Sequence, residues 1–272
     1  MMTSWLAAPL LLATLAQGAP AGGGGVQGYR YNLHMTSDRD RELVATVREG
    51  QGRARIDFER SDDREGNDTY ILLSDNGRTV VFVKPASREY TVVDDTTFER
   101  IVGRALRMVT NLGVVNIQLR DVRIVPERLG VGESIDGRPT RHYRLTQEYR
   151  AFVGAFGIVG DEPVHQLVVT DYWVAARPLL LRNPLIELLA SVETALAQRS
   201  ESFVRRSAAA RDSLFRGTPL RVVVTASSNE HGEPKERRLE LSGLQTGTFD
   251  PAIWRIPDGY TRRQGDLSFD LF

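Results

Sequence analysis

The sequence predicts an α+β fold in which one antiparallel sheet packs against helices. Two long alternating segments around a polar turn form a hairpin at Leu220 to Ser242, and short alternating segments fill residues 29–93. Residues 96–112 and 184–215 instead carry apolar residues at helical spacing. Because strand follows strand over short connections, without a βαβ pattern, we expect the sheet to be antiparallel.

The N-terminal segment has the pattern of a cleaved signal peptide. Trp5 to Leu15 is apolar and leads into small residues that end near Ala21. A membrane-spanning helix needs about 20 apolar residues, so this stretch is too short to span. We therefore expect a signal peptide over 1–21 and a flexible leader over 22–28. The mature protein is expected to be periplasmic or secreted, and not lipidated, because the chain has no cysteine.

Six short segments after this leader alternate apolar and polar residues with a period of two. In the first, Tyr31 and Leu33 alternate with Arg30 and Asn32. Turns rich in polar residues and glycine separate the segments. The six expected strands are 29–35, 43–49, 53–59, 69–74, 79–84 and 88–93.

The middle of the chain changes period twice. Thr96 and Glu99 form a capping box before an apolar stripe that ends at Leu112, which predicts a helix over 96–112. Strands are expected again over 115–125, 140–145 and 164–173. In the first of these the apolar parity shifts, which indicates a β-bulge near Asp121. Turns are expected at Gly130, Gly132 and Gly137.

A second helix is expected over 184–215. Asn183 is a favourable N-cap, and Pro184 suits the first helical position. The segment is too long to lie on a small sheet, so we expect a break or an overhang. Its second half is rich in arginine and either contacts an anionic lipid surface or forms a solvated helix face.

The C-terminal part is expected to close the sheet. Phe249 to Trp254 predicts a short helical turn that carries two aromatic residues inward, and a segment with proline and glycine then ends strand pairing. Trp254 and Tyr260 are expected to seal one end of the sheet. This gives a single domain over 29–263 with a C-terminal tail over 264–272.

Residues that carry chemistry form no recognisable motif. The 35 basic and 35 acidic residues balance, so no basic excess favours nucleic acid. The 4 histidines have no metal-ligand spacing, and the absence of cysteine excludes thiol chemistry. Gly132 to Gly137 misses a nucleophile elbow by one residue and is typical of a turn. We therefore expect no enzymatic activity, cofactor, metal site or nucleic-acid partner.

Five segments together with the exported N-terminus carry a resemblance to a known family. The segments are Gly52 to Asp57, Gly137 to Tyr143, Asp171 to Trp173, Gly217 to Arg221 and Ile256 to Tyr260. Over residues 29–262 the layout resembles the LolA superfamily of periplasmic lipoprotein carriers, and most closely its exported outer-membrane-lipoprotein-sorting-like domains. The resemblance implies a strongly curved, unclosed antiparallel sheet, a half-barrel of about 10–11 strands, with helices covering the concave face. In some members that face holds a lipid chain.

Eight residues on the alternating strands are candidates to line such a face. They are Tyr31, Leu33, Met35, Ile56, Phe58, Tyr143, Val222 and Val224. Apolar residues of this kind either line a ligand cavity or form an ordinary packed core.

Two functions from different classes fit these features. The first is a monomeric envelope protein that binds a lipid or a lipoprotein acyl chain in the concave face. The second is an envelope interaction or sensor domain of the same fold, which recognises a protein partner. An exported hydrolase is a third possibility. A hollow between sheet and helices would favour the first, a filled core with an apolar surface patch the second, and a buried Ser or Asp beside a histidine the third.

Overall fold

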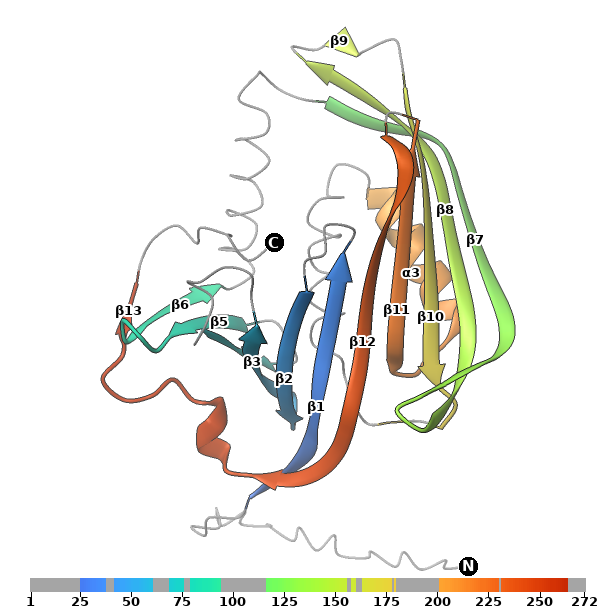
Figure 1. Cartoon of the computed structure of the whole chain (residues 1–272). Coiled ribbons are helices and arrows are strands. Elements are labelled where there is room, and N and C mark those ends of the chain that lie inside the picture. The colour runs from blue at the N-terminus through green and yellow to red at the C-terminus, as the bar shows by residue number, and fades with distance from the viewer. Residues whose placement is uncertain are drawn as a thin grey trace, which may run out of the picture.

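Thirteen strands form a single sheet in the computed structural model of the chain (Figure 1). The structure describes residues 25–37, 42–60, 69–75, 79–93, 116–155, 158–159, 163–177, 179, 201–229 and 231–263. The strands are β1 (Val26–Ser37), β2 (Glu42–Gly50), β3 (Arg53–Arg60), β4 (Tyr70–Ser74), β5 (Thr79–Lys84), β6 (Glu89–Val93), β7 (Asn116–Ile135), β8 (Arg138–Ala155), β9 (Ile158–Val159), β10 (Val164–Ala175), β11 (Pro219–Ser228), β12 (His231–Phe249) and β13 (Thr261–Arg262). They are accompanied by the helix α3 (Glu201–Leu214) and the short 3-10 helix η3 (Pro251–Trp254).

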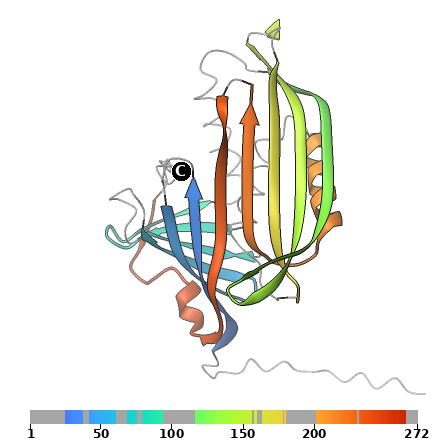
Figure 2. The same ribbon diagram turned by 45° about the vertical axis from the view of Figure 1, so that its right-hand side comes forward.

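The sheet is curved and not closed (Figures 1 and 2). Its order is β13-β6-β5-β4-β3-β2-β1-β12-β11-β10-β8-β7, with β9 paired to β8 beside this path. All neighbouring strands are antiparallel except β13 and β6, which run parallel. The expected antiparallel pairing is therefore confirmed.

The expected α+β class with helices covering the concave face is wrong. Among the described residues α3, with 14 residues, is the one α-helix, against thirteen strands, so the fold is mostly β. The strand number also exceeds the expected 10 or 11. The additional strands are β9 and β13, which contain 2 residues each. Strands β7, β8 and β12, with 20, 18 and 19 residues, are also longer than their alternating cores indicated. The helix expected over 96–112 and the first part of the one over 184–215 lie outside the described residues.

The ends of the expected domain are also adjusted. Strand β1 begins at Val26, inside the segment expected to be a leader. The proline- and glycine-containing segment does not end strand pairing, because Thr261 and Arg262, directly after Tyr260, form β13 beside β6. The signal peptide expected over 1–21 and the tail expected over 264–272 lie outside the described residues.

The long β7–β8 hairpin contains the expected bulge and the expected turn at Gly137, but not the turns expected at Gly130 and Gly132. Asp121 has a positive φ of 53°, and the register with β8 shifts between Arg120 and Arg123. Gly130 and Gly132 lie within β7 rather than in turns, and the chain reverses at Asp136 and Gly137, with φ angles of 50° and 70°. The positive φ of Gly130, 100°, lets β7 bulge and continue.

Strand β7, with 20 residues, lies at one edge of the sheet, so its side away from β8 pairs with no strand among the described residues. An edge of this length invites pairing with other chains. Three register shifts, Pro126 and several charged side chains interrupt it. These are features by which proteins prevent edge-to-edge association, so we regard this edge as protected.

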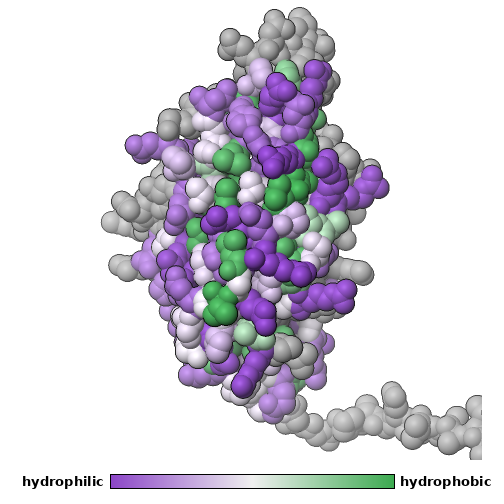
Figure 3. Space-filling view, turned by 90° about the vertical axis from the view of Figure 1, so that its right-hand side faces the viewer, coloured by the Kyte–Doolittle hydropathy of each residue, from purple (hydrophilic) through white to green (hydrophobic). Residues whose placement is uncertain are grey.

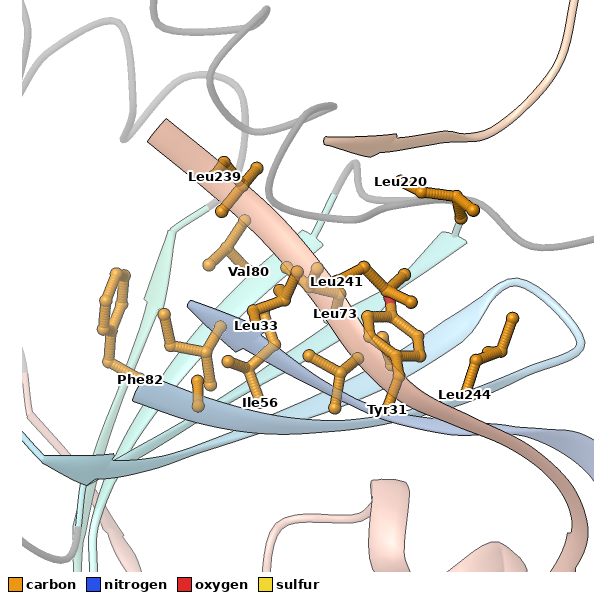
Figure 4. Packing of buried hydrophobic residues seen from close by; sticks show 14 of the residues in the cluster. Tyr31, Leu33, Ile56, Leu73, Val80, Phe82, Leu220, Leu239, Leu241 and Leu244 are labelled. Atoms are coloured by element: carbon orange, nitrogen blue, oxygen red, sulfur yellow. The ribbon is translucent and has the colours of Figure 1, made fainter. Parts of the chain in front are cut away.

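The inner face of the curve carries the main hydrophobic core (Figure 4). A single cluster joins Leu73 and Val80, from β4 and β5, to Leu220 of β11 and Leu239 of β12. Those strands lie several places apart in the sheet, so their side chains meet only because the sheet curves around them.

Helix α3 packs on the same inner face at the β7–β8 end of the sheet, as Figure 2 shows. Gln147 of β8 donates a hydrogen bond of 2.8 Å to the Ser207 hydroxyl. The ring of Phe215, just after the helix, lies 5.4 Å from that of Tyr143 and 5.0 Å from that of Tyr172. The helix therefore covers one end of the inner face.

Strands β4 and β5 are buried on both faces, and the C-terminal segment accounts for this. Tyr70 and Val83, on the outer face, form a second cluster with Ile256 and Tyr260. A strand covered on both sides reads as a continuous apolar run, as in Val80 to Val83.

The expected helical turn before Pro257 is present as η3. Asp250 caps it by accepting a hydrogen bond of 2.8 Å from the Ala252 amide. The Trp254 indole donates to the Arg48 carbonyl at 3.1 Å and meets the Phe249 ring edge-on at 6.1 Å. Trp254 thus packs against the end of β2, whereas Tyr260 packs on the outer face of β4 and β5, so the two aromatic residues anchor different parts of the sheet.

Trp254→Ala should lower the free energy of unfolding by about 3 to 5 kcal/mol, because it removes a large side chain that is 7% exposed. Chemical denaturation of the variant and of Arg255→Ala, an exposed neighbour, measures this. Equal stability of the two variants would show that the segment is not anchored by Trp254.

Candidate functional site

All eight candidate lining residues lie on one face of the sheet. Strand pairing brings Met35 opposite Leu239, Leu239 opposite Val222, and Val222 opposite Tyr172, which pairs with Tyr143. This apolar row therefore runs across five strands, from β1 to β8.

The other five candidates join the same face by the register of neighbouring strands. Phe58 lies opposite Ala45, which pairs with Leu33, and Ile56 lies opposite Val47, which pairs with Tyr31. Val224 pairs with Thr170 and follows Val222 by two residues on β11. The eight residues chosen from the alternation of apolar and polar residues therefore lie on the same face of the sheet.

Burial divides these eight residues into two groups. Tyr31, Leu33 and Ile56 are at most 1% exposed and belong to the packed core. The remaining five residues are partly exposed: Met35, Phe58, Tyr143, Val222 and Val224. The second group is partly exposed to solvent, although Met35, Phe58 and Val222 also pack against the same core.

A buried carboxylate lies beside Tyr31 on the inner face. Glu49 of β2 is 8% exposed and accepts a hydrogen bond of 3.0 Å from the Tyr31 hydroxyl. Burial of a charged group is unfavourable unless it is hydrogen-bonded, so this contact helps to hold the Tyr31 ring in one orientation.

The outer face of the same strands carries a polar cluster that the sequence did not indicate. Asp171 of β10 is 9% exposed and accepts two hydrogen bonds of 3.0 Å from Arg144 of β8. The His142 imidazole lies 2.7 Å from the same carboxylate and stacks on the Trp173 ring at 4.4 Å. The hydrogen bond with Asp171 raises the pKa of Arg144.

A second part of this outer cluster centres on Arg221 of β11. Its guanidinium donates to Glu240 at 2.7 Å and to Glu133 at 2.8 Å, and it lies 5.3 Å from the centre of the Trp173 ring. Hydrogen bonding to Arg221 lowers the pKa of Glu133. Burial by itself would raise the pKa of Glu240, but hydrogen bonds from Arg221 and Arg238 outweigh burial and lower it.

These contacts hold the tip of the β7–β8 hairpin against the ends of β11 and β12. The Leu244 amide donates to the Asp136 carboxylate at 3.0 Å, and Arg138 donates to the Leu244 carbonyl at 3.2 Å. Gly132 is required at the tip, because a Cβ there would come within 2.9 Å of the Trp173 ring.

The His142–Asp171 pair meets the criterion set for a hydrolase, a buried Asp beside a histidine, but lacks a further requirement of catalysis. A catalytic His–Asp arrangement also needs a nucleophile within hydrogen-bonding distance of the imidazole. In the part of the chain that the structure describes, no hydroxyl lies that close to His142, and the carboxylate of Asp171 is shared with Arg144. The pair is therefore best explained as a stabilising contact between β8 and β10.

Metal-binding groups and membrane-spanning helices are not found among the described residues. Those ranges contain no group of three or more His, Asp or Glu side chains suited to hold a metal ion. No helix among them is both long and apolar enough to cross a bilayer.

One signal in the sequence could have indicated the outer cluster. Trp173 occupies a position of β10 that faces away from the apolar side, as do His142 on β8 and Arg221 on β11. An aromatic residue on the polar side of a strand suggests that something covers it. Here the covering element is the hairpin tip at Gly132.

No protein-family model matches the chain, and no curated protein matches it. A solved structure similar to it is the crystal structure of an uncharacterized conserved protein from Thermus thermophilus. The TM-score is 0.37 and the sequence identity 9%, over 88% of this chain and 91% of that chain. These values support no inference on function, so the resemblance to the LolA superfamily stays a prediction from the sequence.

The depressed pKa of Glu240 predicts a pH-dependent stability. In the unfolded chain the pKa of Glu240 returns to about 4.5. The ionised Glu240 carboxylate therefore stabilises the fold fully above that pH, and this stabilisation is lost as the pH falls through the lower pKa of the folded protein. Glu240→Gln should cost about 1 to 2 kcal/mol at neutral pH and progressively less in acid.

Denaturation across pH 3 to 7 measures this difference, with Glu236→Gln on the exposed part of β12 as control. A cost for Glu240→Gln that stays constant down to acid pH would contradict the linkage.

Proposed function

We propose that this protein is a non-enzymatic protein of the cell envelope that binds the acyl chain of a lipid or lipoprotein on the inner face of its curved sheet. The observation that supports this most is the apolar row from Met35 to Tyr143, which crosses five strands and stays partly exposed at both ends. A partly exposed apolar surface on the inside of a curve suits an extended hydrocarbon chain.

The location proposed for this function comes from the sequence. Export through a signal peptide over 1–21 would deliver a cysteine-free protein to the periplasm or the exterior. The resemblance to periplasmic lipoprotein carriers supports the same compartment. We propose a monomer, because the charged and bulged edge of β7 disfavours pairing with a second copy.

A second candidate function is an envelope interaction or sensor domain. It is favoured by the fully buried core around Tyr31 and Leu33 and by two exposed apolar side chains, Leu129 and Val131. A protein partner would then contact the surface, while the inner face would serve stability alone.

Binding of a fluorescent fatty acid tests the first proposal. Val222 lies on the inner face and Val223, the next residue of β11, on the outer face; both are partly exposed. Val222→Asp should weaken binding by at least about tenfold, because a charge in an apolar site is left unpaired. Val223→Asp, the matched control, should bind as the wild type does.

The stability of both variants is measured by denaturation beside the titration, so that loss of binding is separated from loss of fold. A wild type that binds no acyl probe at micromolar concentration would contradict the proposal. Equal weakening by Val222→Asp and Val223→Asp at equal stability would also contradict it.

A further inference from the structure

Near the tip of the β7–β8 hairpin, strand β7 exposes two apolar side chains to solvent. Val131 is 92% exposed and Leu129 is 43% exposed. In the described part of the chain they are the two large hydrophobic residues that are exposed. Figure 3 looks onto the side of the molecule formed by β7 and β8, where hydrophobic residues lie among hydrophilic ones. Apolar side chains grouped on an otherwise polar surface are typical of a contact surface.

Exposed arginines lie next to this tip. Val131 pairs with Arg141 of β8, which in turn pairs with Val174 of β10. Arg177 follows β10 directly, where the Ala176 amide donates to the Pro139 carbonyl at 2.9 Å. Arg216 precedes Gly217, at which a Cβ would come within 2.8 Å of the Val174 side chain.

These arginines are not neutralised by neighbouring acids. Within the described residues no carboxylate lies within ion-pairing distance of Arg141, Arg177 or Arg216. The acid at the tip, Glu133, is held on the other side by Arg221. Among the described residues the corner thus presents three arginines without an ion-pair partner around Leu129 and Val131.

The surface is part of the rigid fold. Arg128, beside Leu129, donates a hydrogen bond of 3.0 Å to the Ser213 carbonyl near the C-terminal end of α3. Gly132, beside Val131, lies against Trp173 and Thr140. The backbone that carries Leu129 and Val131 is therefore anchored on both sides, which lowers the entropic cost of binding.

We propose that this corner, comprising Leu129, Val131, Arg141, Arg177 and Arg216, docks the protein onto an anionic phospholipid bilayer. An anionic bilayer binds both kinds of side chain, because apolar side chains enter the interface and arginines contact lipid phosphates. An acidic protein or a nucleic acid would use the arginines but gain little from a valine at 92% exposure. The proposal stands whether or not the inner face binds an acyl chain.

Co-sedimentation of the full chain with vesicles tests it. The protein should bind vesicles of equimolar phosphatidylglycerol and phosphatidylcholine more tightly than vesicles of phosphatidylcholine alone, and added salt should weaken the binding. The triple substitution Arg141→Gln, Arg177→Gln, Arg216→Gln should weaken it on the order of 100-fold. Leu129→Ser with Val131→Ser should weaken it about tenfold.

The matched control substitutes three exposed arginines elsewhere, as Arg53→Gln, Arg255→Gln, Arg262→Gln, and should bind as the wild type does. All variants carry the same apolar N-terminus, so differences among them report on the corner alone. Circular dichroism confirms that each variant is folded.

Three results would overturn the proposal. The first is equal binding to neutral and anionic vesicles. The second is equal weakening by the two triple substitutions. The third is binding to soluble polyglutamate that depends on the corner arginines in a protein that does not bind vesicles, which would assign the corner to an acidic protein partner.

Discussion

The pairing of β1 with β12 is the contact on which the rest of this structure depends. It joins Val26 to Phe249 and continues to Ser37 and Arg237, so the first strand of the described chain and a strand from its last part form the middle of the sheet. Without it the sheet would separate into one half ending at β1 and another beginning at β12. Each half would then expose its inner face. Closing such a long loop is entropically unfavourable, and the apolar contacts made across the junction must offset that cost.

This junction gives the two faces of the sheet their different characters. On the inner face Leu33 has Ala45 on one side and Leu241 on the other, so the apolar surface continues from one half into the other. On the outer face of the second half, Asp171 and Arg221 connect four strands and the hairpin tip through charged hydrogen bonds. The proposed acyl site lies on the inner face, and the proposed bilayer contact lies at the corner that the outer contacts hold in place.

Local alternation in the sequence was enough to predict the first six strands and the shared face of the eight candidate residues. It also predicted the bulge at Asp121, because a parity shift within one strand is a local signal. The length of β7 was missed because Gly130 and Gly132 resemble turn residues, whereas here they allow a bulge and a close contact with Trp173. The outer cluster was missed for another reason: His142 meets Asp171 only through the register of β8 against β10, which no single strand encodes.

The register of the β1–β12 junction can be tested directly, because the protein has no cysteine of its own. Thr36 and Arg238 are exposed and directly opposite each other across this pair. The double variant Thr36→Cys with Arg238→Cys should form a disulfide under mild oxidation and unfold at a higher temperature than its reduced form. The off-register double variant Thr36→Cys with Glu236→Cys should stay reduced. Disulfide formation in the second variant but not in the first would contradict the junction, and with it the continuous inner face.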